Sequence, residues 1–488
     1  MVQFLHGAEV IEVDDGSRAI QTVRSSVIGL VGTAPNSAGA AFASLQIGSA
    51  IINDGLVYTA QTAGAGGNAV SLTLNRPVDA NAELAVSVSG QKITVSLATD
   101  GNAQGVSTAN EVKAAIEANA EAAELVSVSV LGSGEGEVMS NSESYLSGGA
   151  DEPFPLNTPV AVAGSPLQVS QLGNAGTLGK AFADIFDQTG ALVVVVRVAE
   201  GASDAETQAN IISGMNGWLS AKTETGYQPR ILIAPEFSQF DNVSAEMESK
   251  AERLRGVAYF DCERSASYTD AIKKARQYGR RCEVMWPWVK VFDTDLAKNV
   301  ARPLSARAAG LRARIDAANG FWWSKSNQVI YGIVGTTQPV DWALDDANSV
   351  ANMLNENHVS TVIQEDGYRY WGNRNCATDT QWMYEQTVRT SDMINDSIQR
   401  AHLWAVDRNL TQTYFSEVVE DVNDYLRQLQ SEGAIYDGKC WVDTDINTAE
   451  TVKQGLAYFD FDFEPPFPAE HIIFRSRLND GYIEEIFN

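Results

Sequence analysis

The hydrophobic periodicity of the chain changes abruptly between residues 37 and 152, and this change limits the available folds more than any other feature. Four short segments, at 70–74, 84–88, 93–97 and 126–130, place apolar residues at every second position. Period-2 alternation is typical of strands with one buried face. The stretch therefore predicts a small β-rich domain inserted into the rest of the chain.

The composition of residues 37–152 differs from that of the flanking chain. This stretch holds 14 of the 39 Gly, one Pro and none of the ten Trp, and it carries −10 of the net charge of −27. The sequence Thr108-Ala-Asn-Glu111 has the spacing of a capping box, which predicts one short helix through Ile116. Gly148-Gly149 and Pro153 mark the end of the stretch. We expect a separate domain that faces outward into solvent.

Residues 153–340 show short apolar runs separated by helical stretches such as Asp270–Tyr278. Strands are expected at Leu192–Val198, Ile231–Ala234, Val257–Phe260 and Val284–Trp286. Strands that alternate with helices favour a layered α/β body.

The clearest helical pattern is Thr411–Glu432, in a C-terminal domain expected at 341–469. One stripe at helical spacing is apolar and comprises Tyr414, Phe415, Val418, Val419, Val422, Tyr425, Leu426 and Leu429. The largely opposite face is acidic and comprises Glu417, Glu420, Asp421 and Asp424. Gly433 is a stop signal, so the pattern predicts a long amphipathic helix.

Both ends of the chain are apolar and strand-like. Residues 1–36 are expected to form an N-terminal arm and the first part of the body, and residues 470–488 a C-terminal strand arm. The apolar residues of the two arms are Phe4, Val10, Ile11, Val13, Ile472, Ile473, Phe474, Tyr482, Ile483 and Ile486. Two such ends on one chain are unusual, because termini are commonly loose and polar.

The charge balance excludes some partners. Thirty-five Lys and Arg against 62 Asp and Glu give a surface that repels phosphate backbones and anionic headgroups. We therefore expect no direct nucleic-acid binding.

The first 16 residues contain acidic residues but no Lys or Arg, which argues against a secretory signal. The apolar run Ala191–Val196 stops at Arg197, far short of the roughly 20 residues that span a bilayer, so no membrane insertion is expected.

Motifs of catalysis and cofactor binding are weak in this sequence. The segment Gly173–Lys180 resembles a phosphate-binding loop, but it has one residue too many, and Ala181 replaces the hydroxyl residue that would hold magnesium. A turn leading into a helix over 178–186 is the better interpretation. We expect no enzyme activity and no cofactor.

Metal and disulfide chemistry is not indicated either. The four His, at positions 6, 358, 402 and 471, stand singly, and the four Cys, at 262, 282, 376 and 440, lack C-x-x-C spacing. We expect no metal site and four free thiols, with oxidation within or between subunits as the open alternative.

Arginines are frequent between positions 276 and 314, and four of them recur at short spacing: Arg302, Arg307, Arg312 and Arg314. Together with the acidic face at 417–424 they are candidates for ion pairs with a neighbouring protein. Ordinary surface pairing or pairing within the chain is an equally good interpretation.

Several blocks resemble contractile phage tail sheath proteins, and they occur in the order expected for that family over about three quarters of the chain. They are Phe4–Gly16, Ile28–Pro35, Thr177–Phe182, Gln188–Val198, Arg302–Ser305, Asn355–Val359, Gly367–Asn373 and Phe463–His471. Within 37–152 the likeness to sheaths lapses. That part resembles a small β-rich module that recurs in phage virion proteins, marked by Gly66-Gly-Asn68, Ile93–Thr99 and Gly148–Asp151.

The resemblance implies a structural virion subunit, assembled in the host bacterial cytoplasm. It implies hexameric rings stacked helically around a tail tube, with baseplate and tail terminator proteins at the ends, and a contraction that drives the tube through a bacterial envelope. It also implies that the two arms lend strands to a sheet shared between subunits. The alternative is a virion adhesin that binds a receptor through the β-rich insert.

Overall fold

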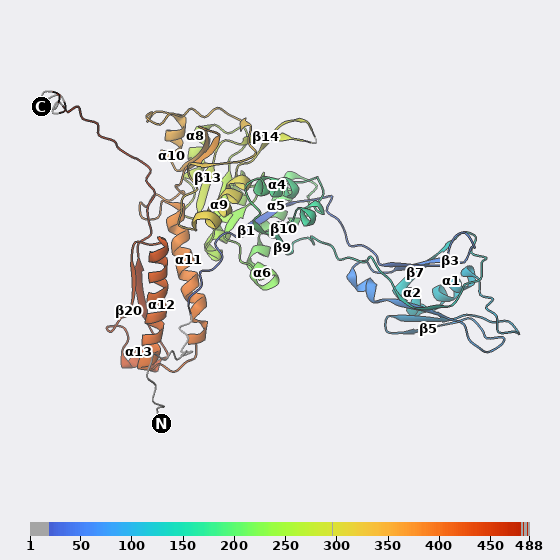
Figure 1. The fold of residues 1–488 in the computed structure, drawn as a ribbon. Helices are drawn as coiled ribbons and strands as arrows, with labels where there is room; N and C mark the ends of the chain where they lie inside the picture. The colour runs from blue at the N-terminus through green and yellow to red at the C-terminus, as the bar shows by residue number, and fades with distance from the viewer. Residues whose placement is uncertain (1–18, 295, 480–481, 483–485, 487–488) are drawn as a thin grey trace. The chain divides into compact units, whose positions relative to one another are not determined.

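The computed structural model describes residues 19–294, 296–479, 482 and 486. Contacts between Cα atoms divide the chain into two units. Unit 1 comprises Met1–Ala34, Asn157–Pro166 and Gly176–Asn488, and unit 2 comprises Pro35–Leu156 and Leu167–Ala175. Figure 1 shows the order of the elements along the chain.

Unit 2 contains two small sheets and four short helices, the last of which begins at Pro166 of unit 1. One sheet has the order β2-β3-β7, with β2 (Ser44–Ile47), β3 (Gly55–Ala60) and β7 (Val126–Leu131). The other has the order β5-β6-β4-β8, with β5 (Ala85–Ser89), β6 (Lys92–Ser96), β4 (Ser71–Asn75) and β8 (Asn141–Tyr145). The short helices are η1 (Ala65–Ala69), α1 (Ala109–Ala118), α2 (Ala120–Leu125) and α3 (Pro166–Ser170).

The alternating residues of unit 2 build one apolar core from both sheets and α1. Leu72, Ile93 and Val112 are each fully or almost fully buried in it. Thr108 caps α1 by accepting a hydrogen bond from the backbone of Glu111, whose side chain accepts one from the Thr108 backbone. The capping box predicted from the sequence is therefore confirmed.

Unit 1 is built on a nine-stranded sheet of order β16-β19-β18-β13-β12-β11-β1-β10-β9. Its strands are β16 (Gln328–Val329), β19 (Tyr368–Trp371), β18 (Val359–Gln364), β13 (Cys282–Met285), β12 (Val257–Asp261), β11 (Ile231–Ile233), β1 (Ile28–Thr33), β10 (Leu192–Val198) and β9 (Pro159–Ala163). The central strands from β18 to β10 run parallel, and β9, β19 and β16 are antiparallel at the edges. Because β18 pairs with β13, this sheet continues past residue 340.

Helices surround this sheet, as an α/β layered body requires. They are α4 (Leu178–Phe186), α5 (Asp204–Gly214), α6 (Asn216–Thr225), α7 (Asp241–Leu254), α8 (Tyr268–Ala275), α9 (Ser305–Asn319) and α10 (Val350–Glu356). Alternate residues of β12 point to opposite faces of the sheet. Phe260 packs in the cluster formed with α5 to α8, whereas Tyr259 faces the side of α9. A small sheet of order β15-β14-β17 adjoins the body, with β15 (Lys298–Arg302), β14 (Val289–Asp293) and β17 (Gly335–Thr336).

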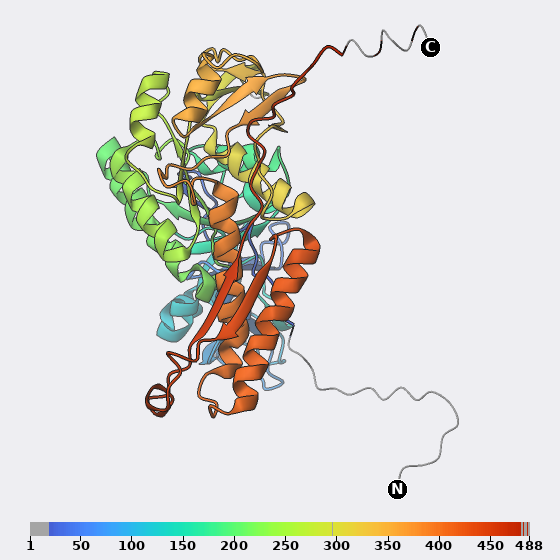
Figure 2. The same cartoon turned by 90° about the vertical axis from the view of Figure 1, so that its left-hand side faces the viewer.

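The C-terminal part of unit 1 is a helical layer with a small ribbon of strands. It comprises α11 (Glu385–Ala401), η2 (His402–Ala405), α12 (Gln412–Glu432), β20 (Gly438–Val442), α13 (Ala449–Lys453) and β21 (Phe459–Phe463). The long helix predicted from the sequence is confirmed, with Thr411 as its N-cap and Gly433 as its left-handed C-cap. Figure 2 shows α12 and the β20–β21 ribbon side by side, and the extended segment that follows β21.

Candidate assembly surfaces

The segment that follows β21 is extended and exposes large apolar side chains. Ile472, Ile473 and Phe474 are 65%, 70% and 91% exposed, and Tyr482 and Ile486 are exposed as well. From residue 464 to 479 no residue belongs to a helix or strand. Exposed apolar side chains on an extended backbone favour contact with a partner. The other predicted arm residues, Phe4, Val10, Ile11, Val13 and Ile483, lie outside the described part of the chain.

Glu470 fixes the point from which this segment leaves the subunit. Arg374 donates hydrogen bonds from Nε to Oε1 of Glu470 at 2.9 Å and from Nη2 to Oε2 at 2.6 Å. The hydroxyl of Tyr384 donates to Oε2 at 3.0 Å, and its ring lies 6.1 Å from the ring of Phe467. The hydrogen bond to Glu470 raises the pKa of Arg374 above its ordinary value. Sequence spacing does not predict this anchor, because 96 residues separate Arg374 from Glu470.

The ribbon of β20 and β21 has two open edges. The strands pair antiparallel from Gly438 opposite Phe463 to Val442 opposite Phe459, and within the described chain neither has a second neighbour. Phe459, Phe461 and Phe463 pack on the apolar cluster of α12. An isolated two-stranded ribbon is only marginally stable, and its unpaired edges accept further strands.

The acidic face of α12 is exposed, as its sequence pattern predicted. Glu417, Glu420 and Asp424 are exposed along one side of the helix. Arg427 pairs with both Glu420 and Asp424, and Asp421 is half-buried. This side of α12 keeps a negative charge and faces away from the core of its own subunit.

Two of the four candidate arginines lie inside the subunit. The side chain of Arg307 is 2% exposed and donates to Asp184 at 2.8 Å. The side chain of Arg312 is 0% exposed and pairs with Asp316 at 2.7 Å. The interpretation of pairing within the chain therefore describes both residues, because a fully buried guanidinium does not reach a neighbouring protein.

The other two arginines are partly buried and also contact their own subunit. Arg302 lies 3.7 Å from Asp293. Arg314 donates to the carbonyl oxygen of Val329, and its guanidinium lies 4.3 Å from the centre of the Tyr331 ring. The apolar surroundings of Arg314 lower its pKa below the ordinary value.

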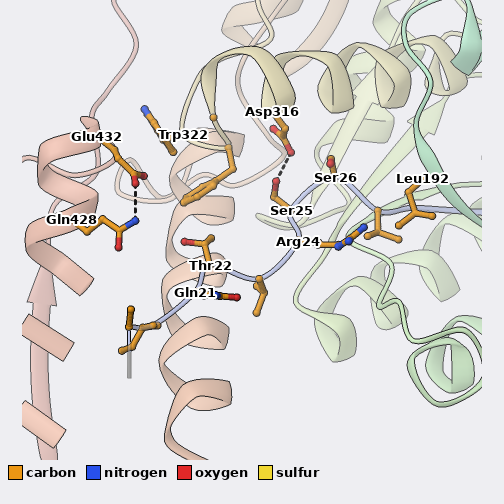
Figure 3. A pocket seen from close by; sticks show the side chains of 16 residues that line it. Gln21, Thr22, Arg24, Ser25, Ser26, Leu192, Asp316, Trp322, Gln428 and Glu432 are labelled. Atoms are coloured by element: carbon orange, nitrogen blue, oxygen red, sulfur yellow. Dashed lines mark hydrogen bonds between the residues drawn. The ribbon is translucent and has the colours of Figure 1, made fainter. Parts of the chain in front are cut away.

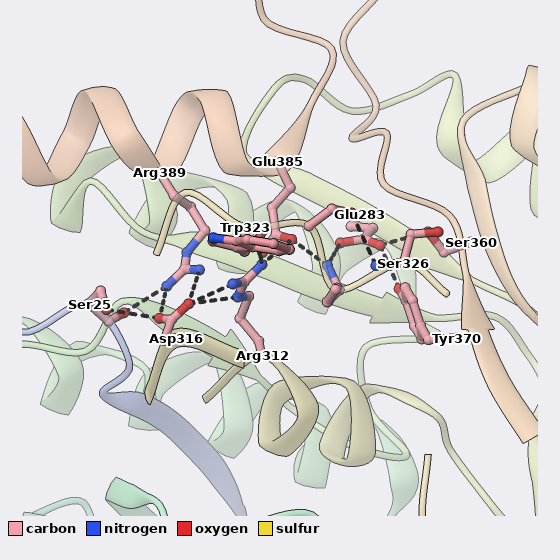
Figure 4. A network of polar contacts seen from close by, with 12 residues as sticks. Ser25, Glu283, Arg312, Asp316, Trp323, Ser326, Ser360, Tyr370, Glu385 and Arg389 are labelled. Carbon is pink, nitrogen blue, oxygen red and sulfur yellow. Dashed lines mark hydrogen bonds and ion pairs between the residues drawn. The ribbon is translucent and has the colours of Figure 1, made fainter. Parts of the chain in front are cut away.

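The buried charges form a network that joins α11 to the α/β body (Figure 4). Asp316 accepts hydrogen bonds from Arg389 of α11, from Arg312 of α9 and from the hydroxyl of Ser25. Burial by itself raises the pKa of Asp316, but the positive charges of Arg389 and Arg312 outweigh burial and hold the pKa at about 2. Asp316 is therefore a buried anion that three separate segments share.

A buried lysine forms the second half of this network. The Nζ of Lys325 lies 2.5 Å from Oε2 of Glu283 and 2.5 Å from Oε2 of Glu385. Tyr370 and Ser360 donate to the other oxygen of Glu283. Burial raises the pKa of Glu385, but Lys325 and the neighbouring arginines outweigh burial and lower it to about 2. These contacts fix the start of α11 and show no opening to solvent, since Lys325, Glu283 and Glu385 are buried.

An open cavity of about 710 Å³ runs along the N-terminal segment Ala19–Val27. Figure 3 shows Ser25 bonded to Asp316, and Gln428 bonded to Glu432, at its wall. The described lining residues include no Cys, His or Lys. Its carboxylates are Asp316, which Arg389 and Arg312 hold by hydrogen bonds, and Glu432.

Lys180 of the phosphate-loop candidate lies in α4, within the helix predicted at 178–186, and its Nζ is 4.0 Å from Glu236. Among the residues that the structure describes, no three His, Cys, Asp or Glu side chains gather to hold a metal ion. Over the same residues, no helix combines the length and apolar character of a membrane span.

Two family models match the chain. The phage tail sheath protein central domain matches residues 205–376, and the phage tail sheath C-terminal domain matches residues 377–479. The tail sheath protein of Escherichia phage P2 is 34% identical over 352 residues, which cover 69% of this chain and 88% of that protein. The tail sheath protein of Burkholderia phage BcepMu is 30% identical over 495 residues, which cover 98% of both.

Solved structures of sheaths share the fold. The contracted sheath complex of an extracellular contractile injection system, PVC, matches with a TM-score of 0.53 and 19% identity over 68% of this chain and 89% of that chain. The contracted helical sheath of the anti-feeding prophage matches with a TM-score of 0.53 and 20% identity over 66% of this chain and 89% of that chain. The mixed α/β fold described above is thus the sheath fold, and the chain belongs to the contractile phage tail sheath family.

Proposed function

We propose that this subunit polymerises as hexameric rings stacked helically around a tail tube, and that its contraction drives the tube through a bacterial envelope. One observation carries the proposal: an extended apolar segment without a partner strand coexists with a ribbon whose two edges are open. A subunit that both donates and accepts a strand forms contacts between unlike surfaces, and such contacts build helical polymers.

In this proposal, exchanged strands hold neighbouring subunits together. The donated residues are those of the two arms, Phe4, Val10, Ile11, Val13, Ile472, Ile473, Phe474, Tyr482, Ile483 and Ile486, and the acceptor is the β20–β21 ribbon of a neighbour. Each added strand forms main-chain hydrogen bonds and places alternate side chains in pockets. A connection made through exchanged arms keeps subunits joined while their bodies rotate between two packings.

The remaining partners follow from the same family. The tube, the baseplate and the tail terminator are the expected neighbours, and the sheath is a component of the virion, assembled in the host cytoplasm before release. The work of contraction is the difference in free energy between two packings of the subunit, and no chemical step is required.

Residues 37–152 are proposed to project outward from the sheath. Their net charge of −10 and lack of Trp suit a solvated position. The P2 relative is matched over 88% of its own length but only 69% of this chain, so sheaths of smaller size exist. An adhesin is not favoured as the function of the whole chain, because the relative that covers 98% of it is a tail sheath protein.

Electron microscopy of the purified protein tests the proposal. The wild type should form striated, hollow tubes, and the double variant Ile472→Asp, Phe474→Asp should remain a soluble, folded subunit without tubes. A matched control is the double variant Ile51→Asp, Val78→Asp, which changes two side chains that are 90% and 92% exposed in unit 2. It should form tubes. Tubes of normal length from the arm variant, or from a variant that lacks Met1–Gly16, would refute strand exchange.

A further inference from the structure

A basic pocket lies where the C-terminal ends of α6, α7 and α11 approach the N-terminal segment. Its volume is about 600 Å³. Its charged lining comprises one acidic residue, Asp396, and six basic residues, Arg24, Lys222, Arg230, Arg253, Arg255 and Arg400. In a chain with a net charge of −27, this local excess of positive charge requires an explanation.

Within the described part of the chain, four of the six basic side chains have no carboxylate partner. Asp396 pairs with Arg230 and, at 2.6 Å, with Arg255. For the other four, the described chain offers no acidic group within ion-pair distance: these are Arg24, Lys222, Arg253 and Arg400. All four are exposed. Their charge is therefore available to a partner.

Helix ends account for only part of this positive charge. Lys222, Arg253 and Arg400 lie in the last turns of α6, α7 and α11. Each helix end carries about half a negative charge, so three ends offset about one and a half of the four positive charges. The pocket remains positive. In addition, the buried Nε of Arg230, a side chain that is 4% exposed overall, has no hydrogen-bond acceptor.

The walls of the pocket combine apolar and charged side chains, which suits contact with a protein surface. Its apolar lining includes Val27 and Leu254, which are buried, and Leu403, which is 77% exposed. Apolar contact beside unpaired charge is the usual composition of a protein interface, in which an apolar centre is bordered by polar groups.

We propose that this pocket receives the acidic face of α12 from a second copy of this chain. Glu417, Glu420 and Asp424 form an exposed stripe that keeps a net negative charge even though Arg427 of the same subunit pairs with Glu420 and Asp424. Pocket and stripe are different surfaces, so their contact does not close on itself and extends a helical polymer. Copies that each carry a charge of −27 repel one another, and a basic pocket opposite an acidic stripe opposes that repulsion locally. This contact rests on the proposed function and assigns it a second intersubunit surface besides the arms.

Charge reversal on each side tests the contact. The pocket variant is Lys222→Glu, Arg253→Glu, and the stripe variant is Glu417→Lys, Glu420→Lys. Each should raise the critical concentration for polymerisation roughly tenfold at low salt, which is the sum expected of a few exposed ion pairs. The combined variant should restore it to within about threefold of wild type, because the reversed charges again attract. Lys290→Glu, Lys298→Glu is the matched control, since both side chains are exposed outside the pocket.

The outcomes distinguish failure of the proposed contact from failure of polymerisation itself. Wild-type assembly together with no effect of the pocket variant overturns the contact and leaves the proposed function in place. Loss of assembly in the pocket variant without rescue in the combined variant also overturns it, because the pocket then serves another acidic partner such as the tube. A wild type that forms no polymer overturns both. Unchanged tryptophan fluorescence shows in each case that the variant is folded.

Discussion

Asp316→Asn is the most direct test of the buried charge network. In the wild type, Asp316 binds Arg389, Arg312 and Ser25, and all of these contacts are buried or nearly so. The neutral amide leaves two buried guanidinium groups without their shared anion. Removal of one partner from a buried ion pair costs about 3–5 kcal/mol. We expect a loss of that size in the free energy of unfolding, out of a total of about 5–15 kcal/mol.

The pH dependence of the free energy of unfolding provides a second, independent estimate of the contribution of Asp316. The pKa of Asp316 is about 2 in the folded chain, against an ordinary value of 3.8. A lowered pKa stabilises the fold at every pH above the ordinary value, and this stabilisation is lost as the pH falls from about 4 to 2. The shift corresponds to about 2 kcal/mol. The Asn variant lacks this contribution, so its stability should fall less steeply over that range.

Urea titration of the unassembled subunit, followed by tryptophan fluorescence, measures the effect. All ten Trp lie outside residues 35–156 and 167–175, so the signal reports on unit 1 alone. Asp270→Asn is the matched control. Hydrogen bonds from Ser267 and Lys273 lower the pKa of Asp270 to about 2 as well, but this side chain is 51% exposed, so a far smaller loss is expected. An Asp316→Asn variant within about 1 kcal/mol of wild type, or one with an unchanged pH profile, would refute the reasoning.

Two further predictions concern other parts of the chain. Thr108→Ala removes the cap of α1 and should cost about 1 kcal/mol of stability. Hydrogen exchange should then be roughly fivefold faster at the α1 amides and unchanged in α12. Equal protection of α1 in the variant and the wild type would contradict this prediction. All four cysteines are buried free thiols, and burial raises the pKa of Cys262 to about 12 and of Cys440 to about 11. Iodoacetamide at pH 8 should therefore modify none of them in the native subunit and all four after unfolding, as read by mass spectrometry, and rapid labelling of the native chain would show that this burial is wrong.

The sequence predicted those elements whose signals are local. The helix α12 begins and ends within one residue of the prediction, because its apolar stripe, N-cap and C-cap glycine all lie within its own segment. The strand β10 was predicted over the same residues that it occupies, because four consecutive valines precede Arg197 in one short run. The strand β13 is shifted by two residues at its start, because its pairing with β12 decides where it begins.

The signals that the sequence could not provide depend on distant partners. Arg307 lies 123 residues from Asp184, and Arg389 lies 73 residues from Asp316. Nothing in the spacing of the arginines distinguishes a buried guanidinium from an exposed one, so pairing within the chain and pairing with a neighbour were equal alternatives. The anchor at Glu470 was missed for the same reason.

The burial of these charges indicates which parts of the subunit would stay together during the proposed contraction and which part would change shape. Ion pairs from four successive turns of α11 join it to the body, through Glu385, Arg389, Asp392 and Asp396. Breaking any of the buried pairs costs about 3–5 kcal/mol, whereas each main-chain hydrogen bond of an added strand contributes about 1 kcal/mol net. An arm can therefore bend, or release a neighbour bond by bond, at forces that leave α11 in place. When one subunit rotates past another, the extended segment after Glu470 would therefore change its conformation. The helices α11 and α12 and the sheet would move as one body.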